Sequence, residues 1–209
     1  MEVQCFALGP VAANSYILTD EKSGEAAVID CGECTPEFLE ALEGRELKYI
    51  LLTHGHADHI LGVYGLKQRF PRAGVAIHYL EARALEDEKY SLGDEIAPGE
   101  QRPVKADITL SDGDELKLGE SVIRVMHTPG HTAGGVCYLL EKERMIFTGD
   151  TLFSLTVGRT DLGGDPYDLY RSVKMLAGLD GDYRIFPGHN RSTTLDYERR
   201  RNRFMRRFK

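Results

Sequence analysis

Four side chains that can bind a metal ion lie within six residues of this sequence, in His54-Gly55-His56-Ala57-Asp58-His59. In a helix, His54 and Asp58 would share one face, but His56 would point away from it. Gly55 directly follows a predicted strand and favours a loop, in which alternating side chains converge on one side. Imidazole and carboxylate are the ligands expected for zinc, iron or manganese. The motif therefore predicts a metal site.

Three further potential ligands each lie just past the end of a predicted strand. They are His131 in HTPGHT, Asp150 in TGDT and His189 in PGHN. A glycine precedes each of them, which lets the backbone turn sharply. Ligands gathered from loops at the ends of strands make a rigid cradle for a metal. We therefore expect these three side chains to join the first four.

The elements that position the first motif are a series of strands and the helices that follow them. The first strands are predicted from apolar runs that are separated by two turn signals, Gly9-Pro10 and Ser23-Gly24. Thr35 and Pro36 form a typical helix start, and Pro71 ends a later helix. The predicted strands are Glu2–Leu8, Ser15–Thr19, Ala26–Ile29, Tyr49–Leu52 and Val75–His78, and the helices after the motif are Ile60–Phe70 and Leu80–Asp87.

A long loop is predicted for Glu88–Ala106, which holds two prolines, two glycines and little periodicity. A loop of this length is usually functional or mobile, and we expect it to border the cleft. A second series of strands follows it, with a helix at Pro166–Ala177 and another from Thr194 onward. The strands of this series are Ile108–Leu110, Glu115–Leu118, Val122–Met126, Val136–Leu140, Met145–Phe147 and Tyr183–Phe186.

Two series of strands, each followed by helices, predict an α/β sandwich of two sheets with helices outside. No linker rich in Pro, Gly or Ser divides the chain, so a single domain over residues 1–209 is expected. The ordered motifs HxHxDH, HTPGHT, TGDTLF and PGH resemble those of the metallo-β-lactamase fold superfamily. The resemblance covers nearly the whole chain and implies a four-layer αββα sandwich.

The resemblance also implies how the ligands are shared between two metal ions. His54, His56 and His131 would bind one ion, Asp58, His59 and His189 would bind the other, and Asp150 would bridge them. Zinc is the first expectation, with iron or manganese as alternatives. In this pattern His127 is not a ligand, and it is interpreted, like His78, as a structural residue.

Two divalent cations in one site lower the pKa of bound water from about 15.7 towards 7, which gives a hydroxide nucleophile at neutral pH. The metals also polarise a carbonyl and stabilise the oxyanion that forms on it. No serine or cysteine nucleophile is then required. Asp58 is the predicted catalytic residue, because it could orient the hydroxide or accept its proton.

Within the superfamily, the chain is similar to the short glyoxalase II-like (hydroxyacylglutathione hydrolase-like) group. The Asn14-x-Tyr16 start, the run Gly149–Phe153 and the run Gly158–Asp161 fit that group. This implies hydrolysis of an S-acylglutathione-type thioester, whose thiolate leaves without a general acid. The chain ends before the C-terminal helical domain that helps full-length glyoxalase II to hold glutathione, so another thioester or ester remains open.

Arg159 is the predicted contact to a substrate carboxylate, since arginine makes bidentate pairs with carboxylates. The alternative is a structural arginine that bonds loop carbonyls or Asp161. There are four alternatives to a glyoxalase II-like hydrolase. Persulfide dioxygenases share this fold and a Gly-Arg-Thr-Asp run but use a single iron. A β-lactamase is disfavoured because no export signal is visible. The other two alternatives are a nuclease and a non-catalytic metal-binding module.

Composition favours an ordinary globular protein, with 42% hydrophobic and 28% charged residues. The net charge is −7, and since Glu198–Lys209 carries +6, the remainder carries −13. An acidic body argues against nucleic acid as the ligand, and the basic tail is interpreted as a solvated terminal helix. We expect a cytoplasmic protein with a small-molecule substrate, no membrane association and free thiols, including Cys31 and Cys34. No oligomeric state is predicted.

Overall fold

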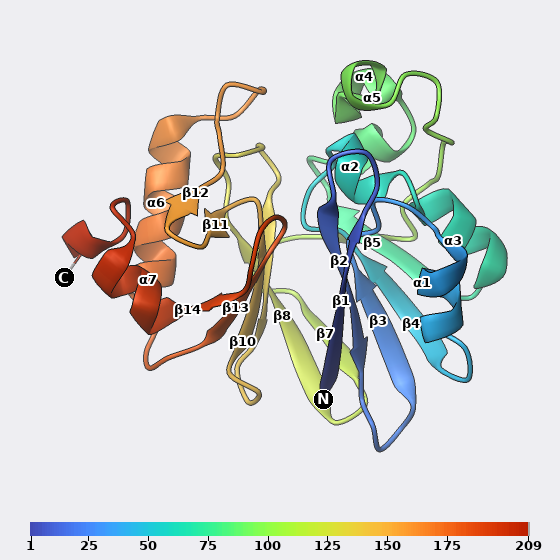
Figure 1. Cartoon of the computed structure of the whole chain (residues 1–209), viewed down its shortest axis with the longest axis horizontal. Coiled ribbons are helices and arrows are strands. Elements are labelled where there is room, and N and C mark those ends of the chain that lie inside the picture. Colours follow the sequence, from blue (N-terminus) through green and yellow to red (C-terminus); the bar gives the residue numbers. More distant parts are fainter. Residues whose placement is uncertain (209) are drawn as a thin grey trace. The chain divides into compact units, whose positions relative to one another are not determined.

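Two sheets of six strands organise the chain, one in each of its two units (Figure 1). This computed structural model describes residues 1–208, and Lys209 lies outside the described residues. Unit 1 comprises Met1–Leu110 and Lys117–Ser121, and unit 2 comprises Ser111–Leu116 and the residues from Val122 on. The single domain expected over residues 1–209 stays a prediction.

The sheet of unit 1 has the order β1-β2-β3-β4-β5-β6. The first three strands pair antiparallel, and β3 to β6 pair parallel to one another. Parallel strands place their carboxyl ends at one edge of the sheet, where loops can gather functional side chains. The strands are β1 (Glu2–Leu8), β2 (Ala13–Thr19), β3 (Glu25–Ile29), β4 (Glu46–Leu51), β5 (Gly74–His78) and β6 (Ile108–Leu110).

The predicted strands of this sheet are confirmed to within three residues, but the prediction for Ile108–Leu110 is wrong in one respect. This strand was expected in the second series, whereas it pairs with β5 in the first sheet. Asp107 explains the placement, because its backbone N–H donates to the Val75 carbonyl and its carboxylate accepts from the Val75 N–H. A strand of only three residues has no sequence pattern that indicates which strand it pairs with.

The helices of unit 1 are shorter than predicted. Within the expected helix Ile60–Phe70, Ile60 ends one helix and Val63–Arg69 form another. The helix is interrupted between them because the Gly62 N–H donates to the Cys31 carbonyl and not to a carbonyl one turn earlier. Of Leu80–Asp87 only a 3-10 turn is helical, and the expected loop Glu88–Ala106 contains two four-residue helices. The elements are α1 (Pro36–Ala41), α2 (Ala57–Ile60), α3 (Val63–Arg69), η1 (Ala82–Leu85), α4 (Glu88–Ser91) and α5 (Gly93–Ile96).

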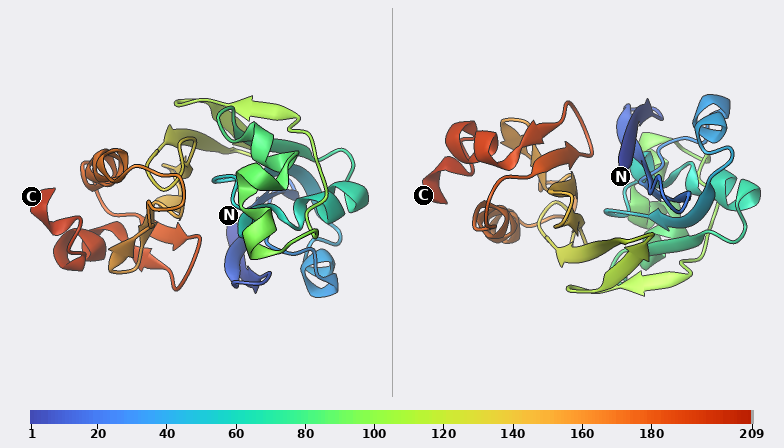
Figure 2. Two further views of the ribbon diagram at one scale, coloured as in Figure 1. Left: turned by 90° about the horizontal axis from the view of Figure 1, so that it is seen from above. Right: turned by 90° about the horizontal axis from the view of Figure 1, so that it is seen from below.

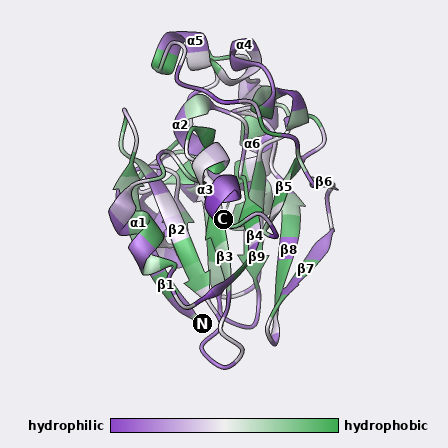
Figure 3. Cartoon of the chain, turned by 90° about the vertical axis from the view of Figure 1, so that its right-hand side faces the viewer, coloured by the Kyte–Doolittle hydropathy of each residue, from purple (hydrophilic) through white to green (hydrophobic). Residues whose placement is uncertain are grey.

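The core of unit 1 lies between its sheet and the helices α1 and α3. Thr35 caps α1 by accepting a hydrogen bond from the Phe38 N–H, and Phe38 is fully buried in this core. It meets apolar side chains from β2 and β4, among them Ile17 and Ile50. Figure 3 shows apolar strands beneath helices whose outer faces are polar.

The sheet of unit 2 has the order β14-β13-β10-β9-β8-β7. β10 pairs parallel with β13 and antiparallel with β9, and β9 pairs antiparallel with β8. The carboxyl ends of β8, β10 and β13 therefore point in one direction. The strands are β7 (Glu115–Leu118), β8 (Ser121–His127), β9 (Val136–Leu140), β10 (Met145–Gly149), β13 (Arg184–Pro187) and β14 (Thr193–Thr194), and β11 (Leu152–Phe153) and β12 (Thr156–Val157) form a separate hairpin.

Two helices, α6 (Pro166–Ala177) and α7 (Leu195–Arg201), pack on one face of this sheet (Figure 2). The predicted bounds of α6 are confirmed, and Asp165 caps it by accepting from the N–H groups of Tyr167 and Asp168. Leu169, Val173 and Leu176 of α6 join a core with the sheet. The terminal helix is shorter than predicted, since it ends at Arg201 and only a 3-10 turn, η2 (Arg206–Phe208), follows.

None of the helices within residues 1–208 has both the length and the apolar character that a membrane-crossing helix requires.

Candidate metal centre

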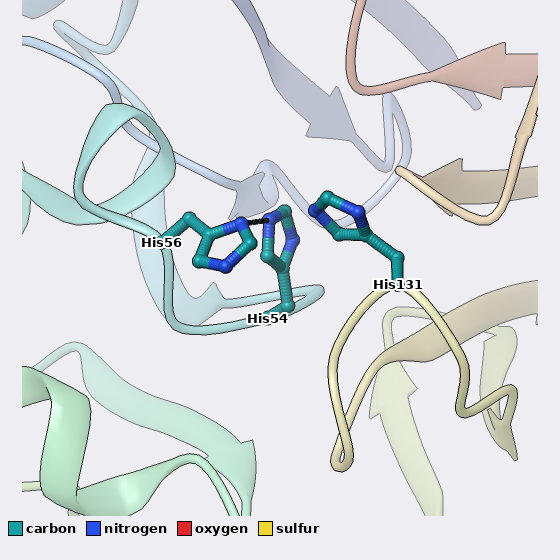
Figure 4. A group of neighbouring side chains, drawn as sticks. All are labelled: His54, His56 and His131. Carbon is teal, nitrogen blue, oxygen red and sulfur yellow. Dashed lines mark hydrogen bonds between the residues drawn. The ribbon is translucent and has the colours of Figure 1, made fainter. Parts of the chain in front are cut away.

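The loop after β4 and the first turn of α2 carry the four potential ligands of unit 1, all of them buried. His54 and His56 lie on the loop, and their atoms Nε2 and Nδ1 are 3.1 Å apart (Figure 4). The structure corrects the prediction that the whole motif is a loop, since Asp58 and His59 lie inside α2. There, Asp58 Oδ2 lies 3.4 Å from His59 Nε2.

Asp30, at the carboxyl end of β3, orients two of these histidines. Its Oδ1 accepts a hydrogen bond from the Thr53 N–H at 2.8 Å, and its Oδ2 accepts from the Thr53 hydroxyl at 2.7 Å. The same Oδ2 lies 2.9 Å from His59 Nδ1. Asp30 is 1% exposed and has a positive φ of 56°. A buried carboxylate in a strained conformation is held there by these contacts.

These contacts fix which ring nitrogen carries the proton. His59 Nδ1 donates to Asp30, so in the neutral ring Nε2 has the lone pair and faces Asp58. The Thr53 hydroxyl already donates to Asp30, so it accepts from His54 Nδ1, which lies 3.1 Å away. His54 Nε2 then has the lone pair and faces His56. A histidine that binds a metal almost always donates its other N–H to such a partner.

The three potential ligands of unit 2 follow β8, β10 and β13, the positions along the chain that the sequence predicts. His131 lies on the loop after β8 (Figure 4), Asp150 directly follows β10, and His189 follows β13. Asp150 Oδ2 lies 3.6 Å from Nε2 of His131 and 3.6 Å from Nε2 of His189. His131 Nδ1 donates to the Arg159 carbonyl at 2.7 Å. One carboxylate oxygen thus lies equally far from two imidazole nitrogens.

The spacing of these atoms fits metal coordination. Ligand atoms about 2.0–2.2 Å from a tetrahedral zinc ion lie about 3.3–3.6 Å from one another. The four pairs of potential ligand atoms described above, each within one unit, are 3.1 to 3.6 Å apart. Imidazole nitrogens and carboxylate oxygens, several with their outer nitrogen held by an acceptor, form a donor set suited to zinc, iron or manganese.

Gly130 shapes the loop that presents His131. Its φ is 134°, and a Cβ there would lie 2.1 Å from the backbone nitrogen of Leu169 in α6. The Gly130 carbonyl accepts a hydrogen bond from the Asp165 N–H, the capping residue of α6. Only glycine combines this backbone conformation with so close an approach. The start of α6 therefore fixes the loop on which His131 lies.

Arg159 makes a bidentate pair with Asp161, at 2.6 Å from Nε and 2.5 Å from Nη2. This hydrogen bonding lowers the pKa of the Asp161 carboxyl to about 2. The arrangement is the structural alternative weighed from the sequence, and the Arg159 carbonyl also supports His131. A substrate contact of Arg159 stays a prediction.

The remaining histidines and the cysteines have structural surroundings. His127 Nε2 lies 2.9 Å from the Ala133 carbonyl, and His78 is buried at the end of β5. Cys31 and Cys34 are free thiols, as predicted. Burial raises the pKa of both, and that of the fully buried Cys137 to about 11. These groups are neutral thiols at physiological pH.

Asp30 and Glu198 are two of the buried acidic residues that sequence reasoning missed. Asp30 had a signal, since it is a charge that directly ends the apolar strand Ala26–Ile29. Glu198 lies in α7 and is 0% exposed. Its Oε1 accepts from the Thr193 hydroxyl, and its Oε2 accepts from the N–H of Leu155 and from Asn202 Nδ2. α7 thereby holds the hairpin that connects Asp150 to Arg159.

We expect Glu198→Gln to lower the free energy of unfolding by about 1–3 kcal/mol, the cost of leaving a buried hydrogen-bonding group without its partner. An amide replaces one carboxylate oxygen, so it cannot accept from all three donors. Urea unfolding measures the change, with the exposed Glu141→Gln as the matched control. Equal unfolding free energies for the two variants would contradict the role assigned to Glu198.

Relatives of known sequence share most of this chain. An uncharacterized protein of Aquifex aeolicus is 37% identical over 212 residues, which covers 98% of this chain and 97% of the relative. The hydroxyacylglutathione hydrolase of Rhodopseudomonas palustris is 34% identical over 176 residues. That alignment covers 83% of this chain and 61% of the relative. The chain therefore spans less than two thirds of the length of that enzyme.

Three solved structures share the fold. The B3 metallo-beta-lactamase BLEG-1 has a TM-score of 0.90 and 32% identity, covering 98% of this chain and 99% of its own. TTHA1623, crystallised in a di-iron-bound form, has a TM-score of 0.82 and 34% identity, covering 96% and 99%. ETHE1 from Myxococcus xanthus has a TM-score of 0.79 and 27% identity, covering 97% and 84%.

The family model described as the metallo-beta-lactamase superfamily matches residues 8–189. Together with the fold similarity, this match confirms the predicted α/β fold class, and the hydroxyacylglutathione hydrolase relatives support the glyoxalase II-like group. With potential ligands at all seven predicted positions, the chain belongs to the metallo-β-lactamase superfamily.

Proposed function

We propose that this protein is a dinuclear metal-dependent hydrolase that cleaves a thioester or ester, with an S-acylglutathione-type compound as the substrate. Membership of the superfamily and the His and Asp residues support a metal-dependent hydrolase. The single observation that carries the proposal is the orientation of His59 and His131. In each of them, the Nδ1–H donates a hydrogen bond to a fixed acceptor and Nε2 faces a carboxylate.

The proposed ligand sets are those that the resemblance to the superfamily implies. His54, His56 and His131 would hold one ion, and Asp58, His59 and His189 would hold the other. Asp150 would be shared between the ions, which its equal distance from His131 and His189 supports. Zinc is the proposed metal, and the di-iron-bound TTHA1623 keeps iron as the alternative, with manganese less favoured.

When bound, two divalent ions would supply hydroxide at neutral pH and stabilise the negative charge that develops on the substrate carbonyl. The chain's own residues then set geometry. Asp30 and the Arg159 carbonyl hold the imidazoles in the tautomers needed. Asp58, fixed in the first turn of α2, orients the nucleophile and accepts its proton. A thiolate leaving group needs no general acid, which favours a thioester substrate.

The glutathione part of the substrate is supported by the name of the Rhodopseudomonas palustris relative. Because this chain spans 61% of that enzyme, the thioester chemistry is the firmer part of the proposal. Arg159 is the proposed contact to a substrate carboxylate, which requires it to exchange Asp161 for the substrate. We place the protein in the cytoplasm, with a small-molecule substrate and without nucleic acid as a ligand.

A panel of substrates assayed beside metal analysis tests the proposal. The purified protein should hold two metal ions per chain and hydrolyse S-lactoylglutathione faster than simple esters. Removal of metal with a chelator should abolish the activity, and zinc should restore it. Turnover of simple esters as fast as S-lactoylglutathione would reject the glutathione assignment and retain the hydrolase. Hydrolysis that survives metal removal would reject the metal-dependent mechanism.

A persulfide dioxygenase is the second candidate. The run Gly158–Asp161 resembles that group, and the similarity to ETHE1 from Myxococcus xanthus favours including it. Oxygen consumption with glutathione persulfide and one iron per chain would select this reaction over hydrolysis. A chromogenic cephalosporin belongs in the same panel because BLEG-1 is a metallo-beta-lactamase. Its hydrolysis in preference to thioesters would replace the proposed substrate class.

A further inference from the structure

A pocket of about 300 Å³ lies wholly within unit 2, where three segments meet. One segment is the loop Gly158–Thr160 after β12, the second is one face of α6, and the third follows α7. Leu169 and Val173 of α6 form an apolar floor, and each is at most 5% exposed. A volume of about 300 Å³ or more is typical of small-molecule sites. The pocket can therefore hold a small organic ligand.

The segment after α7 is anchored, so the wall that it forms is fixed. Met205 is 1% exposed and belongs to the core of unit 2. The side-chain oxygen of Asn202 accepts a hydrogen bond from the Phe204 N–H. The backbone carbonyl of Asn202 accepts one from the Met205 N–H. Phe204 and Arg207, on either side of the anchored residues, line the pocket. The tail is therefore part of the pocket.

Arg207 is the cation at the rim of the pocket. Its guanidinium lies 4.5 Å from the ring centroid of Tyr170 and 5.3 Å from that of Phe208. None of the ion pairs formed among residues 1–208 involves Arg207. Arg159, which also lines the pocket, is paired with Asp161. A guanidinium stacked on a ring keeps its N–H donors in its own plane and can still bind a carboxylate in a bidentate way.

From this arrangement we propose that the pocket binds a small carboxylate with an apolar body, such as a short alkanoate or arylalkanoate. The carboxylate pairs with Arg207, and the body lies on Leu169 and Val173 between Tyr170 and Phe204. A bare anion would leave the apolar floor in contact with water, and a neutral ligand would gain no ion pair with the guanidinium. The inference does not depend on the metal centre or on the proposed reaction.

Calorimetric titration of the full-length, metal-loaded protein with hexanoate tests this site. Hexanoate should bind, and acetate and hexanamide should each bind at least about tenfold more weakly, because each lacks one half of the recognised ligand. Arg207→Gln should weaken hexanoate binding by about 10- to 100-fold, as expected for a hydrogen bond to a charged group. Arg206→Gln is the matched control, since Arg206 is exposed and does not line the pocket, and it should leave binding unchanged.

A carboxylate could also bind at a metal, so the titration is repeated with His54→Ala after metal removal. Hexanoate binding that persists there, and still responds to Arg207→Gln, supports the pocket even if the proposed hydrolase activity fails. Binding that disappears with the metal would overturn the inference. Equal effects of Arg207→Gln and Arg206→Gln would overturn it as well, and so would the absence of binding at 10 mM hexanoate, about the weakest affinity of interest. Tighter binding of hexyl phosphate would overturn the choice of a carboxylate.

Discussion

Asp150→Ala should abolish hydrolysis and release metal from the purified protein. Asp150 Oδ2 lies 3.6 Å from both His131 Nε2 and His189 Nε2, so one side chain serves the ligands proposed for two different ions. In the proposed centre, its loss would remove a ligand from each ion and also the negative charge between two cations. The loss of activity should exceed about 100-fold, the upper limit typical of residues that only support ligands. Turnover and metal content per chain measure the effect.

Asp180→Ala is the matched control, because Asp180 is an exposed acidic residue of the same unit and is not one of the potential ligands. It should keep metal and activity at the level of the unchanged protein. Circular dichroism should show both variants folded, since Asp150 follows β10 and belongs to neither apolar core. If Asp150→Ala retains two metal ions and full activity, the bridging role is wrong.

Three of the potential ligands could be predicted from the sequence because each follows a strand and a sharp turn. This works for His131, Asp150 and His189, whose positions depend on local order along the chain. It fails for Asp30, whose role depends on the parallel pairing of β3 with β4. That pairing places Asp30 beside Thr53, 23 residues away along the chain. A one-dimensional pattern contains the acid but not its neighbour.

The fold shows the same division between local and distant causes. Pro166–Ala177 was predicted to the residue, because its proline and apolar face lie within the helix and its capping aspartate directly precedes it. The helices Glu88–Ser91 and Gly93–Ile96 were missed, since four residues are too few to show a helical period. The break at Gly62 depends on its contact with Cys31, 31 positions earlier, which no local pattern contains.

Asp30→Asn should lower metal affinity by about 10- to 100-fold, the effect typical of a residue that orients a ligand. The change keeps the size of the side chain but replaces one acceptor oxygen by an NH₂ group. If the amide oxygen keeps the bond from the Thr53 N–H, the NH₂ group faces His59 Nδ1 and must donate to it. The proton of the neutral ring then moves to Nε2, the atom that faces Asp58.

In the opposite orientation, the amide oxygen accepts from His59 Nδ1 again. The NH₂ group then faces the Thr53 N–H, so that two donors face each other. Both orientations therefore harm the site, and the loss should appear in metal affinity measured by chelator competition. Asp20→Asn is the matched control, since Asp20 is also buried in unit 1 and accepts from a backbone N–H and a hydroxyl. That control should leave metal affinity unchanged. If Asp30→Asn binds metal as tightly as the unchanged protein, Asp30 supports the strand and not the potential ligands. That result would also remove the main structural argument for the orientation of His59.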